Sequence, residues 1–197
     1  MRRFLIGPAG LACAAILACS GGKGGGGLVS PPPGPVATFQ CDDSAAATDQ
    51  VVLRCGAKVA ADVWRIDVVI GVPTTSTDIN GFVFDVVYDP LLLAYVPGSA
   101  RAGTLLISDG GTQLFAAALE PGHPGDLVVG INRPSADGGG VAGILGHDLI
   151  MSFQIRSRTA APFGPEFVRF EKTMAVDSAD APIPGITFSD QLLLSLR

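Results

Sequence analysis

Histidine, tryptophan and tyrosine are scarce in this chain of 197 residues, which contains two, one and two of them. His123 lies in the turn-like stretch PGHPG and His147 precedes an expected strand, and neither has an evident nucleophile beside it. The chain also lacks a Gly-x-Ser-x-Gly elbow, a His-Glu-x-x-His pair, a P-loop and a dinucleotide fingerprint. We therefore interpret both histidines as solvated loop residues and expect no enzyme activity.

Charge is sparse as well, at 16% of the residues, and basic residues are outnumbered by acidic ones, 13 to 18. No run of Lys or Arg occurs, and a chain without basic clusters is a poor nucleic-acid binder. The three glutamates, Glu120, Glu166 and Glu171, are scattered. Nothing in their spacing points to the carboxylate pair of a glycosidase.

Metal-ligating patterns are also missing. The stretches SDGG (108–111) and SADGGG (135–140) contain one aspartate each. Calcium takes about six to eight oxygen ligands, so we interpret both stretches as Gly-rich turns. Two cysteines far from any histidine do not make a tetrahedral zinc set. We expect neither a metal nor a cofactor.

An apolar run extends from about Phe4 to Ala18, which is shorter than the roughly 20 residues of a stable membrane span. It follows Arg2 and Arg3, a pattern typical of a signal peptide over residues 1–18. Its end, ILAC (16–19), resembles the lipobox of bacterial lipoproteins. The resemblance implies cleavage before Cys19, lipid on the Cys19 thiol and acylation of the new amino terminus. The alternative is an ordinary cleaved signal peptide with a chance cysteine.

Residues 19–35 are predicted to form a tether behind that anchor. Gly-rich coil followed by prolines gives a reach of roughly 20–25 Å. Several acyl chains hold a protein firmly at a membrane. By resemblance to Gram-negative sorting signals, Ser20 after the lipidated cysteine implies the outer membrane. Loss of Arg2 and Arg3 with the signal would change the formal net charge from −5 to −7.

Residues 36–197 amount to one domain's worth of chain. Apolar and polar residues alternate in VWRIDVVIGV (63–72), GFVFDVVYDP (81–90) and LIMSFQIRSR (149–158), which predicts half-buried strands. Breakers such as Asp89-Pro90 and Pro121-Gly122 separate these runs. Many short strands of this kind favour an antiparallel β-sandwich. Further strands are expected at 36–40, 51–54, 112–119, 126–132, 167–176 and 191–196.

The alternation also predicts which side chains face the core. The outer face of the strand at 81–88 would then carry Val83, Asp85 and Val87, our candidate binding residues, because a binding face needs exposed apolar groups with a polar rim. Side chains expected to face the core are Trp64, Ile66, Val68, Ile70 and Val72, then Phe82, Phe84, Val86 and Tyr88, and then Leu149, Met151, Phe153 and Ile155.

The four cysteines divide into two groups. Cys13 would leave with the signal peptide and Cys19 would take lipid, so Cys41 and Cys55 remain in an oxidising compartment. A disulfide between them is the natural interpretation. In the loop-entropy description it would contribute about 3 kcal/mol to stability.

The segment INGFVFDVVYDPLLLAYVPGSARAGTLL (79–106) resembles the part of cohesin domains in which an alternating strand ends in Tyr-Asp-Pro. PGDLVVGINRPSADGGGVAGILGHDLIMSFQIR (124–156) resembles the later cohesin strands around a Gly-rich loop. The resemblance implies a jelly-roll sandwich of about nine strands, related to some carbohydrate-binding modules. Tyr88, Asp89 and Pro90 are interpreted as fold markers, because Asp89 can cap a turn and Pro90 ends a strand.

The same resemblance implies a non-catalytic role, commonly the binding of a dockerin. The EF-hand-like pattern of a dockerin is absent, so this chain would be the receiving member of such a pair. The sequence thus predicts a lipid-anchored envelope protein that binds a protein partner. Two alternatives stay open, a carbohydrate-binding module and, behind it, a hydrolytic enzyme; the few aromatic residues argue against the first.

Overall fold

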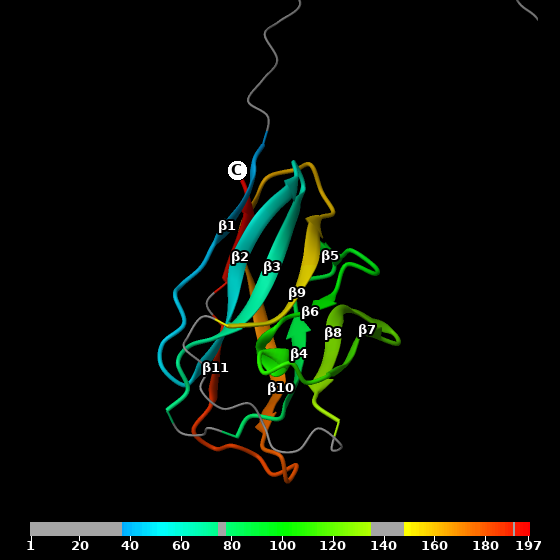
Figure 1. Ribbon diagram of the computed structural model, residues 1–197. Helices are drawn as coiled ribbons and strands as arrows, with labels where there is room; N and C mark the ends of the chain where they lie inside the picture. Colours follow the sequence, from blue (N-terminus) through cyan, green and yellow to red (C-terminus); the bar gives the residue numbers. More distant parts are fainter. Residues whose placement is uncertain (1–36, 75–77, 135–147, 191) are drawn as a thin grey trace, which may run out of the picture. The chain divides into compact units, whose positions relative to one another are not determined.

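The computed structural model describes residues 37–74, 78–134, 148–190 and 192–197, which form two β-sheets around one hydrophobic core (Figure 1). A single 3₁₀ turn, Leu105–Ile107, accompanies the strands of these residues. Sheet I has the strand order β1 (Phe39–Asp42), β12 (Leu192–Leu196), β10 (Phe163–Val176), β4 (Gly81–Val87), β8 (His123–Asn132), β7 (Leu114–Glu120). Sheet II has the order β11 (Thr187–Ser189), β2 (Gln50–Ala60), β3 (Val63–Ile70), β9 (Asp148–Ser157), β5 (Leu93–Tyr95), with β6 (Arg101–Ala102) also paired to β9.

The core lies between the inner faces of the two sheets. Phe82 and Phe84 of β4 are fully buried there, together with Ile66 of β3 and Phe153 of β9. Side chains two residues apart point to the same side of a strand, which is why these apolar positions alternate with polar ones. Burial of this set supplies the main force that holds the sheets together. The predicted all-β sandwich is therefore confirmed.

Nine of the described strands have four or more residues, and three are shorter. The three short strands β5, β6 and β11 lie outside the sequence ranges predicted as strands. β11 also departs from the expected antiparallel arrangement, because it pairs parallel with β2. No hairpin joins these two strands, which are far apart in the sequence, so their relative direction is not fixed by a short turn.

Three side chains assigned to the core face are not enclosed in the core: Trp64, whose contact with Phe39 is described below, Val72 and Leu149. Val72 is exposed, because β3 already ends at Ile70. Leu149 is half-buried and Ile150 is fully buried in its place. The register of β9 against β3 shifts between Leu149 and Met151, and such an irregularity changes which residues face inward. Period two alone could not predict that shift.

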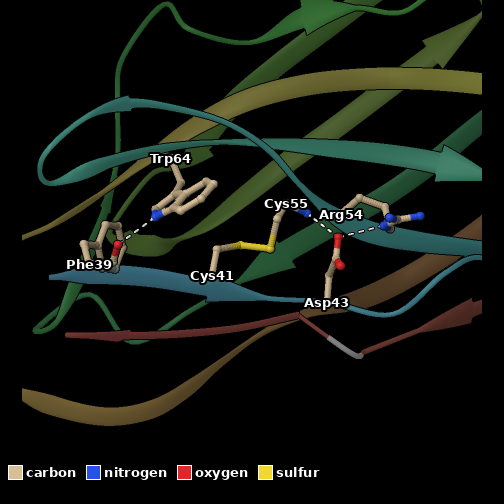
Figure 2. Close-up of a disulfide and its surroundings, with 6 residues drawn as sticks. All are labelled: Phe39, Cys41, Asp43, Arg54, Cys55 and Trp64. Carbon is tan, nitrogen blue, oxygen red and sulfur yellow. Dashed lines mark hydrogen bonds and ion pairs between the residues drawn. A yellow bond between two sulfur atoms is a disulfide. The ribbon is translucent and has the colours of Figure 1, made fainter. Parts of the chain in front are cut away.

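The N-terminal strand is fastened to both sheets. β1 pairs with β12 in sheet I, and a disulfide joins Cys41 of β1 to Cys55 of β2 in sheet II, with 5.9 Å between the Cα atoms (Figure 2). Beside it, Asp43 Oδ2 accepts hydrogen bonds from Arg54 Nε and from the Cys55 backbone N–H, both at 2.7 Å. The bridge therefore crosses from one layer of the sandwich to the other.

Phe39 of β1 supplies a second fastening point. Its carbonyl oxygen accepts a hydrogen bond from Trp64 Nε1 at 3.1 Å (Figure 2). It also accepts one from Lys58 Nζ at 2.9 Å. Trp64 is half-buried over this contact rather than enclosed in the core. Thr38 exchanges two backbone hydrogen bonds with Arg197, so the first described residues lie beside the C-terminus.

Tyr88, Asp89 and Pro90 close β4 as the sequence indicated. The Tyr88 hydroxyl donates to the Pro124 carbonyl and accepts from the Tyr95 backbone N–H, both at 3.0 Å. Asp89 Oδ1 accepts from the Leu91 backbone N–H at 2.8 Å, which is the side-chain cap expected of a turn.

None of the described residues belongs to a helix long and apolar enough to cross a membrane.

Candidate binding face

The outward surface of β10, β4, β8 and β7 is the face on which the predicted binding residues lie; we name it the outer face of sheet I. Antiparallel register places side chains from the four strands in rows across this face. One row contains Met174, Val83, Gly130 and Ala116, the next Glu171, Asp85, Val128 and Ala118, and the third Arg169, Val87 and Asp126.

Apolar side chains gather on this face. Val83, Val128 and Met174 are 41%, 38% and 39% exposed, and Leu114 on the edge strand is 59% exposed. Gly130 has open space above its Cα, so the backbone itself is accessible between them. Single exposed valines are ordinary, but the register brings Val83, Val128 and Met174 together on adjacent strands of one face. Such surfaces are typical of binding sites.

Four charged residues, Lys172, Asp85, Glu120 and Asp126, lie together on this face beside the apolar surface; we name them the charged row. Lys172 Nζ lies 2.6 Å from Asp85 Oδ2, 3.7 Å from Glu120 Oε2 and 3.8 Å from Asp126 Oδ2. The Asp85 side chain is only 4% exposed, whereas Lys172 is 63% exposed. The row therefore joins residues of β10, β4, β7 and β8.

A β-bulge aims Lys172 into that row. The pairing of β10 with β4 is irregular between Glu171 and Met174, and Lys172 has φ 48° within the irregular stretch. Positive φ is uncommon for a residue with a side chain. Bulges re-aim side chains in this way, and here the ammonium group is directed over the carboxylate of the neighbouring strand.

The electrostatics of the row follow from burial and hydrogen bonding. The hydrogen bond and charge of Asp85 raise the pKa of Lys172, which keeps its ammonium protonated. Burial raises the pKa of Asp126, and its hydrogen bond with Glu120 acts in the same direction. That hydrogen bond, together with one from His123, lowers the pKa of Glu120. Asp126 is thus the member of the carboxyl pair that holds a proton longest as pH rises.

Two carboxylate oxygens in the row, Asp85 Oδ2 and Asp126 Oδ1, are fully buried. The ammonium of Lys172 covers Asp85 Oδ2 as an ion pair, and Asp126 is hydrogen-bonded to Glu120. The most exposed charged group of the row is therefore the side chain of Lys172.

Of the predicted residues, the structure exposes Val83, half-buries Val87 and buries Asp85 beneath Lys172. Sequence reasoning missed Lys172 and the Glu120–Asp126 pair. The alternation of outward residues in β8 could have indicated Asp126, but no local sequence pattern predicts the bulge at Lys172. The contact between Asp126 and Glu120 joins two strands, so predicting it would have required the register of β7 against β8.

A shallow groove of about 510 Å³ borders the charged row. Tyr88, Pro90, His123 and Asp126 are among the residues that line it, and no serine, threonine or cysteine does. His123 is largely exposed, with Nδ1 at 3.3 Å from Glu120 Oε2. The groove therefore lacks the serine or cysteine that a histidine-activated nucleophile needs. His147 and the stretch 135–140 lie outside the described residues, as do Cys19 and the tether.

Neither a metal cluster nor an aromatic platform is found in the part of the chain that the structure describes. Those residues contain no group of three His, Cys, Asp or Glu side chains that could hold an ion. At the SDGG turn, Asp109 accepts from the Gly111 backbone N–H and pairs with Arg133 Nη1 at 2.8 Å. Among the described large apolar side chains with high exposure, Phe167 is the aromatic one.

No protein-family model matches the chain, and no curated protein matches its sequence. Solved structures do match. The sixth cohesin of scaffoldin B from Acetivibrio cellulolyticus, solved with a dockerin, has a TM-score of 0.55 at 16% identity, over 73% of this chain and 95% of that one. The fold is cohesin-like.

Two further structures agree. A type I cohesin–dockerin complex from Clostridium thermocellum has a TM-score of 0.52 at 11% identity and covers 78% of this chain and 96% of that one. A cohesin from Clostridium acetobutylicum, solved in solution, has a TM-score of 0.51 at 15% identity over 72% and 87% of the two chains. At these identities the matches establish the cohesin-like fold and leave the partner to be argued from the outer face.

Proposed function

We propose that this chain is a non-catalytic lipoprotein of the bacterial cell envelope whose cohesin-like sandwich binds a protein partner through the outer face of sheet I. The observation that carries the proposal is the exposed apolar surface of Val83, Val128 and Met174 beside a charged row whose Lys172 side chain is 63% exposed. Apolar contact surface with oriented polar groups at its border is the composition of protein interfaces.

We infer a dockerin-type partner as the first candidate. The similar cohesins from A. cellulolyticus and C. thermocellum were solved in complex with dockerins. Their fold is the property shared with this chain, so the inference concerns partner class alone.

The carbohydrate alternative has less support. Sugar platforms use rows of exposed aromatic rings, and Trp64 is engaged with Phe39 instead. The hydrolase alternative has less support again, because His123 lies beside Glu120 and the neighbouring groove is lined by no serine, threonine or cysteine. Neither alternative has as much support as the binding of a protein on the outer face.

The test is a capture experiment with matched variants. The purified chain is immobilised and exposed to the envelope and secreted proteins of its source, with calcium and with chelator. We expect a protein that the wild type retains, that Val83→Asp loses, and that Val59→Asp still retains. Val59 is a comparably exposed valine on β2 of sheet II, so it controls for the added charge.

The outcomes separate the hypotheses. Retention that disappears on chelation supports a dockerin-type partner, because a dockerin carries the calcium loops. Retention independent of calcium supports another protein partner. A partner lost equally from both variants would remove the outer face as the site, and a retained polysaccharide with no retained protein would favour the carbohydrate module.

The proposed anchor is tested separately. Cells that express the chain are labelled with radioactive palmitate, and the label is followed into wild type, Cys19→Ser and Cys13→Ser. We expect label on the wild type and on Cys13→Ser and none on Cys19→Ser. Equal labelling of all three, or none in any, would contradict lipidation at Cys19. Separating the inner and outer membranes and detecting the protein in each fraction then tests the outer-membrane localisation that we propose from Ser20.

A further inference from the structure

Several loops and strand ends meet where the chain enters the sandwich. Thr38 exchanges backbone hydrogen bonds with Arg197 there, and Ser157 at the end of β9 donates its backbone N–H to the Asp62 carbonyl. Figure 1 shows the turn between β2 and β3 at the same end as the C-terminus and the start of β1. We name this region the tether end and define it as residues 37–39, 58–62, 89–92, 156–162 and 196–197.

Apolar side chains are exposed at the tether end. Leu91 is 80% exposed, the largest fraction among the described large apolar side chains, and Val59 is 52% exposed. The Leu92 carbonyl accepts a hydrogen bond from the Arg158 backbone N–H, which places Leu91 beside the end of β9. Exposed small apolar residues accompany them: Ala60, Ala61, Ala160, Ala161 and Pro162. The tether end therefore presents apolar surface that the sandwich itself does not cover.

Charge is distributed unevenly between the two ends of the strands. Counting side chains, the tether end has four basic residues, Lys58, Arg156, Arg158 and Arg197, and two acidic ones, Asp62 and Asp89. The opposite end, at 47–50, 71–74, 78–81, 132–134, 148 and 176–183, has five aspartates and one arginine: Asp49, Asp78, Asp148, Asp177, Asp180 and Arg133. The formal net charge of −5 is thus not a property of the tether end.

We propose that the tether end binds the surface of an anionic lipid bilayer. Leu91 and Val59 enter the headgroup layer, and Arg156 and Arg158 contact lipid phosphates. Apolar side chains beside Lys or Arg are the combination that binds membrane surfaces, because the first group leaves water and the second is attracted to anionic headgroups. Arginine in particular matches the geometry of phosphate oxygens.

The place where the chain enters favours a lipid surface over other occupants, in an argument that rests on the proposed lipid anchor. Residues 20–36 would connect the anchor at Cys19 to Ala37, which belongs to the tether end. A connection with a reach of roughly 20–25 Å holds this end near the bilayer, at an effective concentration on the order of millimolar. A contact too weak to hold a free domain at a membrane is then occupied. The acidic opposite end would be repelled by the same headgroups.

Such a contact would orient the binding face. The strands of sheet I run between the tether end and the opposite end, so the outer face of sheet I would stand beside the bilayer and stay open to a protein partner. The inference goes beyond the proposed function, because it assigns a second surface with a ligand of its own.

The first test measures vesicle binding by residues 19–197 carrying Cys19→Ser, which we name the reference chain. It retains every described residue, lacks the apolar run at 4–18 that would itself enter lipid, and cannot be acylated at Cys19. Flotation over a lipid titration compares phosphatidylcholine vesicles with vesicles that contain about one third phosphatidylglycerol, and we expect a preference of about tenfold or more for the second. Binding to neither kind of vesicle, or equally to both, overturns the proposal.

A matched pair of neutral substitutions tests the apolar contact. Val72 is 45% exposed at the opposite end, so Leu91→Gln and Val72→Gln each remove one exposed apolar side chain without adding charge. Leu91→Gln should lower the partition coefficient on anionic vesicles by about fivefold or more, and Val72→Gln should leave it unchanged. Unchanged thermal unfolding shows that each variant keeps its fold. Equal losses from the two variants would overturn the proposal.

A second pair tests the orientation. Arg156 lies on β9 at the tether end, whereas Arg101 pairs with Ser152, four residues back along β9 and about 13 Å away, beyond the screening length of about 8 Å. Both side chains are exposed. Arg156→Gln should weaken vesicle binding by about fivefold, and Arg101→Gln should not. Equal losses would mean that sheet II lies flat on the lipid, which overturns binding through the tether end.

A fluorescent label tests which end enters the lipid. The two cysteines of the reference chain form the Cys41–Cys55 bridge, so a cysteine introduced as Leu91→Cys or Val72→Cys can be labelled alone. The label is a fluorophore whose emission moves to shorter wavelength in apolar surroundings. We expect that shift on anionic vesicles for the label at 91 and none for the label at 72. A shift for neither label, or for the label at 72, would overturn the proposal.

Lipid binding and partner binding can be separated with two variants of equal charge. We expect Val59→Asp to lose vesicle binding while it still retains the captured protein, and Val83→Asp to lose the captured protein while it still binds vesicles. Either idea can therefore fail without the other. The anchor is separable as well, because the reference chain is not acylated and its vesicle binding does not depend on the palmitate result for Cys19. Loss of vesicle binding in Val83→Asp but not in Val59→Asp would overturn the tether end as the lipid site.

Discussion

Lys172 Nζ lies 2.6 Å from Oδ2 of Asp85, and this contact puts a cation from a bulged strand over a carboxylate that is almost fully buried. The two residues belong to neighbouring strands of sheet I, and the sequence pattern indicated Asp85 but not Lys172. Their contact defines the charged row on the outer face. It also makes the neutralisation of Asp85 depend on one side chain that is itself mostly exposed.

We expect Lys172→Met to lower the melting temperature, because Asp85 would remain buried without its cation. The double variant Asp85→Asn/Lys172→Met should recover part of the loss, since it removes the uncompensated charge. Thermal unfolding of both variants and of Asp85→Asn alone completes the cycle. Additive effects of the two single changes would contradict a direct interaction between the residues.

The raised pKa of Asp126 predicts a pH dependence of stability. A carboxyl whose folded pKa exceeds its unfolded value stabilises the fold at low pH and loses that contribution as pH rises through the folded value. The melting temperature of the wild type should therefore fall relative to Asp126→Asn as pH increases above 3.8, the ordinary value. Glu120 behaves oppositely, since its lowered pKa gives a contribution that is lost on acidification.

Melting temperatures of the two proteins from about pH 3 to about pH 8 measure this difference. Asp42→Asn, a change at an exposed position of β1, serves as the control. A difference between wild type and Asp126→Asn that is flat with pH, or that moves in favour of the wild type as pH rises, would contradict the assignment of the shared proton to Asp126.

Tyr88→Phe should lower the free energy of unfolding by about 1–3 kcal/mol. The Tyr88 hydroxyl serves both the Pro124 carbonyl and the buried Tyr95 backbone N–H, and phenylalanine leaves both without it. Tyr95→Phe is the matched control, because that hydroxyl accepts one longer bond, 3.3 Å from the Ala100 backbone N–H. Urea unfolding of the two variants decides, and an equal loss would contradict the double role of Tyr88.

Reduction of the Cys41–Cys55 bridge should lower the free energy of unfolding by about 2–4 kcal/mol. Urea unfolding with and without reductant gives the value, and Cys41→Ala/Cys55→Ala should reproduce it without reductant. A free energy of unfolding that does not change with reductant would show that the pairing with β12 and the contacts of Asp43 and Phe39 hold β1 in place without the bridge.

The sequence was most informative where one face of a strand is buried throughout. In β4, Phe82, Phe84, Val86 and Tyr88 alternate with outward residues, and the core follows that alternation. It was least informative at irregularities of the ladder. The shift at Leu149 and the bulge at Lys172 depend on how two distant strands meet, which no local pattern records.

The same division applies to the candidate site. Val83, Asp85 and Val87 follow from period two on a single strand. Lys172 and the Glu120–Asp126 pair come from three other strands, and their approach is set by register and burial. Asp85 illustrates the limit well, since the sequence placed it on the outer face but could not indicate that a lysine covers it.

The disulfide also has a mechanical consequence. The chain enters the sandwich at Thr38 beside Arg197, and β1 then runs along β12 to Cys41 before the bridge to sheet II. Tension applied to the chain ahead of residue 37 would peel β1 from β12 one pair at a time. At Cys41 it would reach a covalent bond to a strand of the other sheet. Pulling on single molecules should therefore give a much shorter first extension under oxidising than under reducing conditions, and a domain tethered at this end would keep its remaining strands paired under load.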